Sequence, residues 1–162
     1  MRVVLDTSAI IYLQDFRKFD EIFIPTLVVE EVKDKLSTIK LEALNAKKLE
    51  PQKNFLEEVK AIAKKTGDLE KLSNTDLQVL ALAKELNATI ISDDYNVQNV
   101  AKRLGIEFLP VFSKGIKKIF FWKKYCPSCK KFFKSNLKEC PICGTKLKRL
   151  PRARQAIRRE QL

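Results

Sequence analysis

Short apolar runs alternate with amphipathic segments along the first two thirds of the chain. Strand-like runs occur at 3–5, 20–25, 48–50, 88–91 and 106–109, and segments with helical spacing occur at 8–14, 26–36, 74–87 and 95–104, with further helical sequence between 37 and 66. Uninterrupted apolar runs of this length are typical of strands that are covered on both faces. Strands that alternate with helices of about ten residues predict a parallel α/β sheet with right-handed crossovers.

Acidic residues stand where two of these strands end. Asp6 follows the run at 3–5, and Asp93 and Asp94 follow the run at 88–91, with Ser92 between. Ligands of open α/β sheets bind beyond the carboxyl ends of the strands, so these acids stand where a ligand is expected. Each acid could instead cap the helix that follows it, and strand position alone leaves both readings open.

Two helical segments bring further acids. Glu31 lies on the apolar stripe of the helix predicted at 26–36, whereas its neighbour Glu30 is turned towards solvent. A carboxylate on an inward face costs free energy unless it is paired or binds a metal, although Lys35 at i+4 could be its partner. Asp76 lies in the first turn of the next amphipathic helix, where the helix dipole also favours an anion.

The absence of histidine narrows the possible chemistry. The sequence has no histidine, which excludes Ser-His, Cys-His and His-ligated metal sites and leaves carboxylates and cysteines. Four or five carboxylates at one end of a sheet would raise one another's pKa, and a hard cation such as Mg²⁺ or Mn²⁺ relieves that repulsion. Such a cation can also activate water for phosphodiester cleavage.

Four motifs, in this order, resemble the acidic signature of the PIN domain, a family of metal-dependent ribonucleases: DTSAII, EEVKD, SNTDLQVLALA and ISDDYNVQNVA. The resemblance covers about residues 1–111 and implies a PIN-like α/β/α domain with a central parallel sheet. It implies that Mg²⁺ or Mn²⁺ is held by Asp6, Glu31, Asp76 and Asp94, with Asp93 as a further catalytic acid and with Ser8 and Ser92 as hydroxyls near the site. The choices between Glu30 and Glu31 and between Asp93 and Asp94 stay open.

Charge and cysteines divide the chain. Residues 1–113 contain 16 Lys and Arg against 18 Asp and Glu, whereas residues 114–162 contain 16 against 2, together with all four cysteines. We therefore expect a nuclease domain at 1–112, a zinc ribbon at 113–149 and a basic tail at 150–162. The paired spacing of Cys126, Cys129, Cys140 and Cys143 predicts one structural Zn²⁺ bound by four thiolates. Disulfides are disfavoured because no secretory signal is evident.

The strongly basic composition of residues 114–162 is typical of a protein segment that binds a polyanion. Its lysines alternate with aromatic residues, a pattern that suits single-stranded RNA through base stacking and phosphate contacts. The candidate RNA-binding residues are Lys123, Lys124, Lys130, Lys131, Lys134, Arg149, Arg152 and Arg154. The alternative is that several rings form the small core of the ribbon and that the tail is a solvated end.

A PIN domain followed by a CPxC zinc ribbon resembles the NOB-type (Nin-one-binding) endonuclease family, and DDYNVQN and the GIK…W…CPSC junction carry this resemblance. The compact form, without a large insertion, suits an archaeal member, and Lys130 stands where glycine is common. The resemblance implies a metal-dependent endoribonuclease that matures the 3′ end of small-subunit (16S/18S-type) ribosomal RNA, with precursor RNA and the pre-small ribosomal subunit as partners. The alternatives are a toxin-type PIN ribonuclease acting on tRNA or mRNA and a non-catalytic RNA-binding assembly factor.

The hydropathy pattern gives no sign of a membrane partner, because no run of about 18 apolar residues is present. We therefore expect a cytoplasmic protein. The oligomeric state is open, with a monomer favoured.

Overall fold

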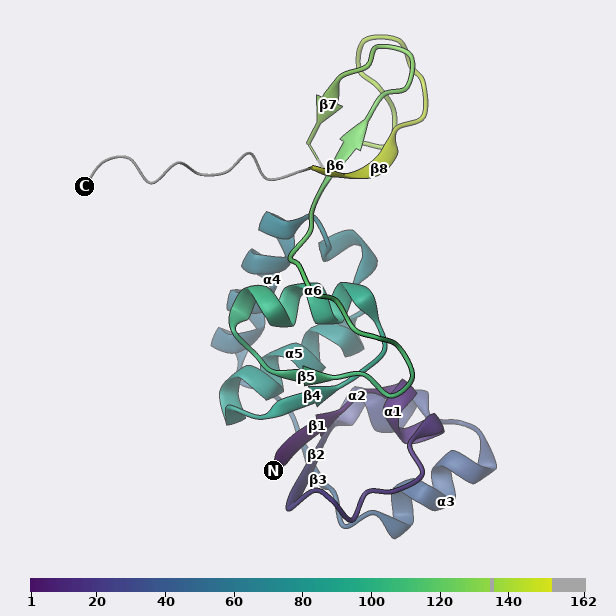
Figure 1. Cartoon of the computed structure of the whole chain (residues 1–162), viewed down its shortest axis with the longest axis vertical. Coiled ribbons are helices and arrows are strands. Elements are labelled where there is room, and N and C mark those ends of the chain that lie inside the picture. Colours follow the sequence, from purple (N-terminus) through teal and green to yellow (C-terminus); the bar gives the residue numbers. More distant parts are fainter. Residues whose placement is uncertain (135, 153–162) are drawn as a thin grey trace, which may run out of the picture.

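The computed structural model describes residues 1–134 and 136–152, which form two units with separate sheets (Figure 1). The larger unit contains β1 (Arg2–Leu5), α1 (Thr7–Tyr12), β2 (Glu21–Pro25), α2 (Thr26–Glu31), α3 (Lys35–Ala43), β3 (Lys47–Leu49), α4 (Lys53–Thr66), the 3-10 helix Leu69–Lys71, α5 (Asn74–Leu86), β4 (Thr89–Ile91), α6 (Tyr95–Leu104) and β5 (Phe108–Leu109). The smaller unit, called the ribbon below, contains β6 (Phe121–Tyr125), β7 (Phe132–Phe133) and β8 (Lys148–Arg152). Within the described ranges, every helix is too short or too polar to cross a membrane.

The larger sheet is parallel throughout and has the order β3-β2-β1-β4-β5. The central strand β1 pairs with β2, where Val4 lies opposite Phe23, and with β4, where Val4 lies opposite Ile90. Val3 and Val4 are completely buried, as expected for a strand covered on both faces. The predicted fold class, a PIN-like parallel α/β sheet followed by a small β ribbon, is confirmed.

Helices α4, α5 and α6 lie between the two sheets in Figure 1. Helix α5 contacts β1, β2 and β4, and α4 packs against α5 and α6. Helices α1, α5 and α6 all carry a side-chain cap at their first turn, from Asp6, Ser73 and Asp94 respectively. Two of these caps, Asp6 and Asp94, are acids that the sequence analysis predicted as metal ligands.

The helix predicted at 26–36 is interrupted. Helix α2 ends at Glu31, and α3 begins at Lys35 because the Asp34 carboxylate accepts the backbone N–H of Ser37 at 2.9 Å and caps a new helix. Glu31 is therefore the last residue of α2 and is exposed. The expectation that it lies on a buried stripe was wrong.

The ribbon is an antiparallel sheet in which β6 pairs with both β7 and β8. In the β6–β8 ladder, Tyr125 lies opposite Lys148 and Phe121 lies opposite Arg152. The ribbon sheet therefore includes residues 150–152, which the sequence analysis assigned to the tail, because their backbone pairs with β6.

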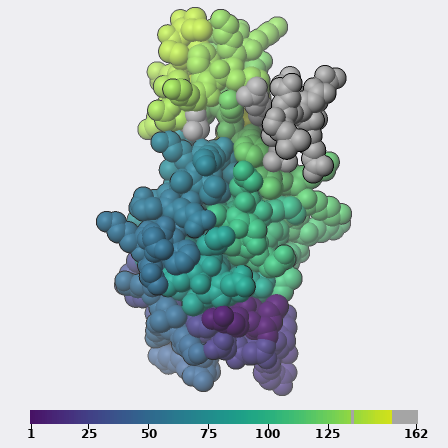
Figure 2. Space-filling model, turned by 90° about the vertical axis from the view of Figure 1, so that its left-hand side faces the viewer, coloured from purple at the N-terminus to yellow at the C-terminus, as the bar shows by residue number. Residues whose placement is uncertain are grey.

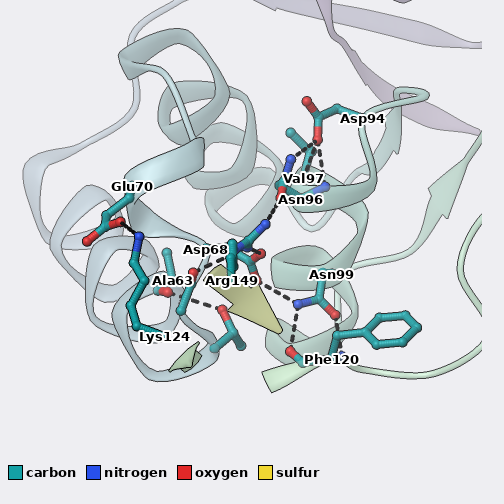
Figure 3. Close-up of polar contacts among 12 residues, drawn as sticks. Ala63, Asp68, Glu70, Asp94, Asn96, Val97, Asn99, Phe120, Lys124 and Arg149 are labelled. Carbon is teal, nitrogen blue, oxygen red and sulfur yellow. Dashed lines mark hydrogen bonds and ion pairs between the residues drawn. The ribbon is translucent and has the colours of Figure 1, made fainter. Parts of the chain in front are cut away.

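A buried ion pair joins the ribbon to the larger unit (Figure 3). The Asp68 carboxylate is 0% exposed, and Arg149 of β8 donates to its Oδ1 atom at 2.5 Å and to the Gly67 carbonyl oxygen at 3.2 Å. Asn99 of α6 donates to Oδ2 of Asp68 at 2.6 Å. Burial raises the pKa of Asp68, and the contacts with Asn99, Thr66 and Arg149 offset part of that shift.

Further contacts fix the same junction. Gly67 has a left-handed φ of +80°, and a Cβ atom there would overlap the carbonyl oxygen of Trp122. The Asn99 side chain donates to the Phe120 carbonyl oxygen at 2.8 Å and accepts the Phe120 backbone N–H at 2.7 Å. Lys124 pairs with Glu70 at 3.1 Å. Figure 2 accordingly shows the ribbon seated on the larger unit.

We expect Arg149→Met to lower the free energy of unfolding by about 3–5 kcal/mol, because it leaves the Asp68 charge buried without a partner. The folded-state pKa of Asp68 is already raised and rises further without Arg149. The deficit should therefore be largest at neutral pH and shrink as pH falls and Asp68 takes up a proton. Urea unfolding at neutral and mildly acidic pH measures both effects.

The double variant Asp68→Asn with Arg149→Met serves as the control, because it removes both charges and should recover part of the stability. A single Arg149→Met variant as stable as wild type at neutral pH would show that this ion pair does not hold the junction.

Candidate active site

Asp6 lies at the carboxyl end of β1 and is buried. Its Oδ1 atom accepts the backbone N–H of Thr7 at 2.7 Å, and its Oδ2 atom accepts the hydroxyls of Ser92 at 2.6 Å and Ser8 at 3.2 Å. Burial raises the pKa of Asp6, these three hydrogen bonds oppose the shift, and the nearby Asp94 charge adds to it. The carboxylate is thus tightly oriented but electrostatically unfavourable as an anion.

Asp76 and Asp94 approach Asp6 from two helix starts. Asp76 shares a capping box with Ser73, whose backbone N–H donates to Oδ2 of Asp76 at 2.7 Å. Burial raises the pKa of Asp76, and the charges of Asp6 and Asp94 raise it further against the hydrogen bonds from Ser73. The charge of Asp94 acts on Asp6, and the charges of Asp6 and Asp94 act on Asp76, so the three carboxylates lie in one region at the end of the sheet.

Asp94 caps α6 with one of its two oxygens. Its Oδ1 atom accepts the backbone N–H groups of Asn96 and Val97 at 2.6 and 3.2 Å and the Asn96 side-chain amide at 3.1 Å (Figure 3). Within the part of the chain that the structure describes, Oδ2 is the oxygen of Asp94 that remains for a cation. Capping and metal binding are therefore compatible at this residue.

Glu31 joins the same region through two threonines. Its Oε2 atom accepts the Thr7 hydroxyl at 2.8 Å, and its Oε1 atom accepts the Thr75 hydroxyl at 2.5 Å. Thr7 and Thr75 each directly neighbour one of the other acids, Asp6 and Asp76. The sequence analysis missed both threonines; their signal was a hydroxyl residue beside each acid, in DTS and NTD.

Asp93 does not join these acids. Its carboxylate accepts the backbone N–H groups of Val111, Phe112 and Ser113 at 2.9–3.2 Å. Although partial burial acts to raise the pKa of Asp93, these hydrogen bonds lower it overall. Asp93 therefore anchors the chain that leaves β5, and the expectation of a catalytic Asp93 conflicts with this geometry.

The donor set suits a hard cation, because carboxylate oxygens are the ligands that Mg²⁺ and Mn²⁺ prefer. Among the described residues, the four cysteines form a group of three or more ligands that lie close enough together to hold a metal ion, and the carboxylates do not form a second group of this kind. Mg²⁺ does not need so compact a set of protein ligands, because it commonly keeps several of its waters.

The four cysteines form a compact sulfur cluster in the ribbon. The Sγ atoms of Cys126 and Cys143 are 3.5 Å apart and those of Cys129 and Cys140 are 3.8 Å apart, with all four inside 4.8 Å. Tetrahedral zinc with Zn–S bonds of about 2.3 Å places sulfur atoms about 3.8 Å apart. The cluster therefore fits a structural zinc ion, as predicted.

The two cysteine pairs are built alike. The backbone N–H of Lys130 donates to the Cys126 carbonyl oxygen, and that of Gly144 donates to the Cys140 carbonyl oxygen, both at 2.9 Å. Lys130 adopts a left-handed φ of 56°, close to the 69° of Gly144. The lysine thus keeps the turn that glycine makes in the second pair, at a conformational cost of about 1–2 kcal/mol.

The candidate RNA-binding residues have different environments. Lys130, Lys131 and Lys134 are exposed, and Lys123 is partly exposed. Lys124 pairs with Glu70, and Arg149 is committed to Asp68 and to the Trp122 ring, 4.2 Å away. Arg149 therefore has a structural role that the sequence analysis did not predict. Arg152 lies in β8, and Arg154 lies outside the described residues.

The purified chain should contain one zinc ion, and a strong chelator should remove it and unfold the ribbon. The helical circular-dichroism signal should persist, because the helices of the described residues belong to the larger unit. Metal analysis and circular dichroism during chelation measure the two effects. Cys126→Ser should reproduce the chelated state, and simultaneous loss of the helical signal would contradict the independence of the larger unit.

The sequence matches two related families: one described as "PIN domain of ribonuclease" over residues 3–86 and one described as "PINc domain ribonuclease" over residues 62–120. A protein of Pyrococcus abyssi named "Endoribonuclease Nob1" is 44% identical over 96% of this chain and 98% of its own length. A protein of the same name from Methanocaldococcus jannaschii is 40% identical over 90% of this chain and 76% of its own length.

A third relative has a different name. "Ribonuclease VapC1" of Thermoplasma acidophilum is 40% identical over 92% of this chain and 78% of its own length. All three relatives are named as ribonucleases, and each match covers at least 90% of this chain. By these similarities, the chain belongs to the PIN-domain ribonucleases and, within them, to the endoribonuclease Nob1 family.

Proposed function

We propose that this chain is a metal-dependent endoribonuclease that matures the 3′ end of small-subunit ribosomal RNA. The observation that carries the proposal is the convergence of Asp6, Asp76 and Asp94 at one end of the sheet, where the Asp94 charge raises the pKa of Asp6 and the charges of Asp6 and Asp94 raise the pKa of Asp76. The substrate rests on the resemblance to the NOB-type family and on relatives that share nearly the full length of the chain.

In this proposal Asp6, Glu31, Asp76 and Asp94 hold Mg²⁺ or Mn²⁺. Such a cation, when bound, lowers the pKa of a water molecule and offsets the charge of the phosphate. The hydroxyls of Ser8 and Ser92 orient the Asp6 carboxylate and lower its pKa against the effect of burial. The hydroxyls of Thr7 and Thr75 orient the Glu31 carboxylate. With no histidine in the sequence, carboxylates are the groups available to accept the proton of an attacking water.

The ribbon supplies the RNA contacts in this proposal. The exposed side chains of Lys130, Lys131 and Lys134 are suited to phosphate, and such contacts position the RNA without reading its sequence. Because the Asp68–Arg149 ion pair fixes the ribbon on the larger unit, these lysines keep a constant distance from the acids. The partners are then precursor ribosomal RNA and the pre-small ribosomal subunit, in the cytoplasm.

A toxin-type ribonuclease acting on tRNA or mRNA is the second candidate, favoured by the similarity to the Thermoplasma acidophilum protein. Substrate choice separates the two. Selective cleavage of a precursor that spans the 3′ end of the small-subunit RNA supports the first proposal, and selective cleavage of tRNA or mRNA supports the second.

The Asp6→Asn variant should lose cleavage of this precursor by more than about 100-fold, because even outer-shell partners of a metal contribute about 10–100-fold. It should still bind the RNA, since the ribbon is unchanged. Cleavage in Mn²⁺ and binding by filter retention measure the two properties.

A matched pair of variants controls for general loss of charge. Glu31→Gln should impair cleavage strongly, whereas Glu30→Gln, at the exposed neighbouring position, should cleave like wild type. Cleavage that survives in Asp6→Asn, or equal effects at Glu30 and Glu31, would refute the assignment of these acids.

A further inference from the structure

A cavity of about 390 Å³ lies between the start of α6 and the chain that leads into the ribbon. Its lining residues include Tyr95, Asn96, Ile116, Lys117, Phe120 and Trp122. This volume is in the range of small-molecule binding sites. None of the carboxylates described above is among its lining residues.

The cavity offers aromatic surface that is accessible from outside. Tyr95 is 57% exposed and Phe120 is 38% exposed. The rings of Phe120 and Trp122 are stacked with their centroids 5.7 Å apart. Planar rings that gather around an open cavity suit a planar ligand, because such a ligand can stack on them.

The walls of the cavity are held in place before any ligand arrives. The Asn99 side chain forms hydrogen bonds with both the N–H and the carbonyl oxygen of the Phe120 backbone. The backbone N–H of Ile116 donates to the Gln98 side chain at 3.0 Å. The Arg149 guanidinium lies over the Trp122 ring. A pre-formed site loses less conformational entropy on binding, so these contacts favour affinity.

The cavity adjoins the candidate metal site. Tyr95 and Asn96 are the two residues that follow Asp94, and the Asn96 side chain donates to Asp94 Oδ1 at 3.1 Å (Figure 3). A substrate whose phosphate reaches Asp94 therefore brings its neighbouring groups to the cavity mouth.

The electrostatic surroundings favour an anionic chain. Lys117 lines the cavity, and Lys114 and Lys118 are exposed in the same linker. Aromatic surface combined with lysines is the arrangement by which proteins bind single-stranded nucleic acid. A base inside a duplex cannot present its face to such a wall, so the occupant must be unpaired.

We propose that this cavity binds one unpaired nucleobase of the RNA strand that is cleaved, stacked against Tyr95, Phe120 and Trp122, with Lys117 contacting its phosphate. The inference rests on the proposed function in taking RNA as the substrate. It makes Tyr95 a positioning residue that sets the register of the strand relative to Asp94.

Trp122 is the only tryptophan of the chain, so its fluorescence reports on this cavity. We expect a single-stranded 12-nucleotide oligoadenylate to quench that fluorescence saturably, in zinc-loaded protein without added Mg²⁺ or Mn²⁺. The same sequence in a duplex should not quench it. Tyr95→Ala should weaken the affinity by on the order of ten-fold, the effect of losing one stacked base, and Tyr95→Phe should restore it.

Phe112→Leu is the matched control, because Phe112 is an exposed ring of the same linker, at 71% exposure, outside the cavity. It should leave the quenching unchanged. The proposal is overturned if single-stranded RNA binds without quenching Trp122, if the duplex quenches equally, or if Tyr95→Ala binds like wild type.

The result is independent of catalysis. A protein that cleaves the precursor without quenching of Trp122 rejects the cavity and keeps the proposed function. A protein that shows quenching but cleaves no RNA rejects the proposed function and keeps the cavity as a binding site for single-stranded RNA.

Discussion

The parallel pairing of β1 with β4 is the constraint on which the candidate site depends. Leu5 lies opposite Ile91, and the backbone N–H of Asp6 donates to the Ile91 carbonyl oxygen at 3.2 Å. The residues that follow each strand, Asp6 and Ser92, are therefore side by side, and the Ser92 hydroxyl holds the Asp6 carboxylate. A shift of one residue in this register would turn Asp6 to the other face of the sheet.

A second constraint fixes where the ribbon can be. The Asp68–Arg149 ion pair is buried at the junction, and Arg149 also donates to the Asn96 side chain at 3.3 Å. Asn96 in turn donates to Asp94. Two polar contacts, from Arg149 to Asn96 and from Asn96 to Asp94, thus connect the ribbon to an acid of the candidate metal site. The position of the ribbon and the orientation of Asp94 therefore depend on the same hydrogen-bond network.

The features that could be predicted from sequence are those decided by neighbours along the chain. The apolar run before Asp6 specifies a buried strand, and the cysteine spacing specifies a sulfur cluster, whichever way the rest of the chain folds. The proximity of Asp6 and Asp94 could be predicted because both follow parallel strands, which end at one edge of a sheet. Asp76 lies at a helix start, and it was assigned to the site by the resemblance to the PIN domain.

The features that could not be predicted depend on contacts between distant segments. Asp93 and Asp94 are adjacent in sequence, yet Asp93 bonds the backbone at 111–113 while Asp94 caps α6. Arg149 is of a residue type that often contacts RNA phosphates. In this structure it instead pairs with the buried carboxylate of Asp68, 81 residues away in the sequence. Charge and periodicity do not specify such pairings.

The most direct test of the account is to locate a divalent cation in the protein. Crystals soaked in Mn²⁺ should show an anomalous-scattering peak at the end of the sheet, among the carboxylates of Asp6, Asp76 and Asp94, and the peak should vanish in Asp6→Asn. A peak elsewhere with none among these carboxylates, at Mn²⁺ concentrations that support cleavage, would contradict the account.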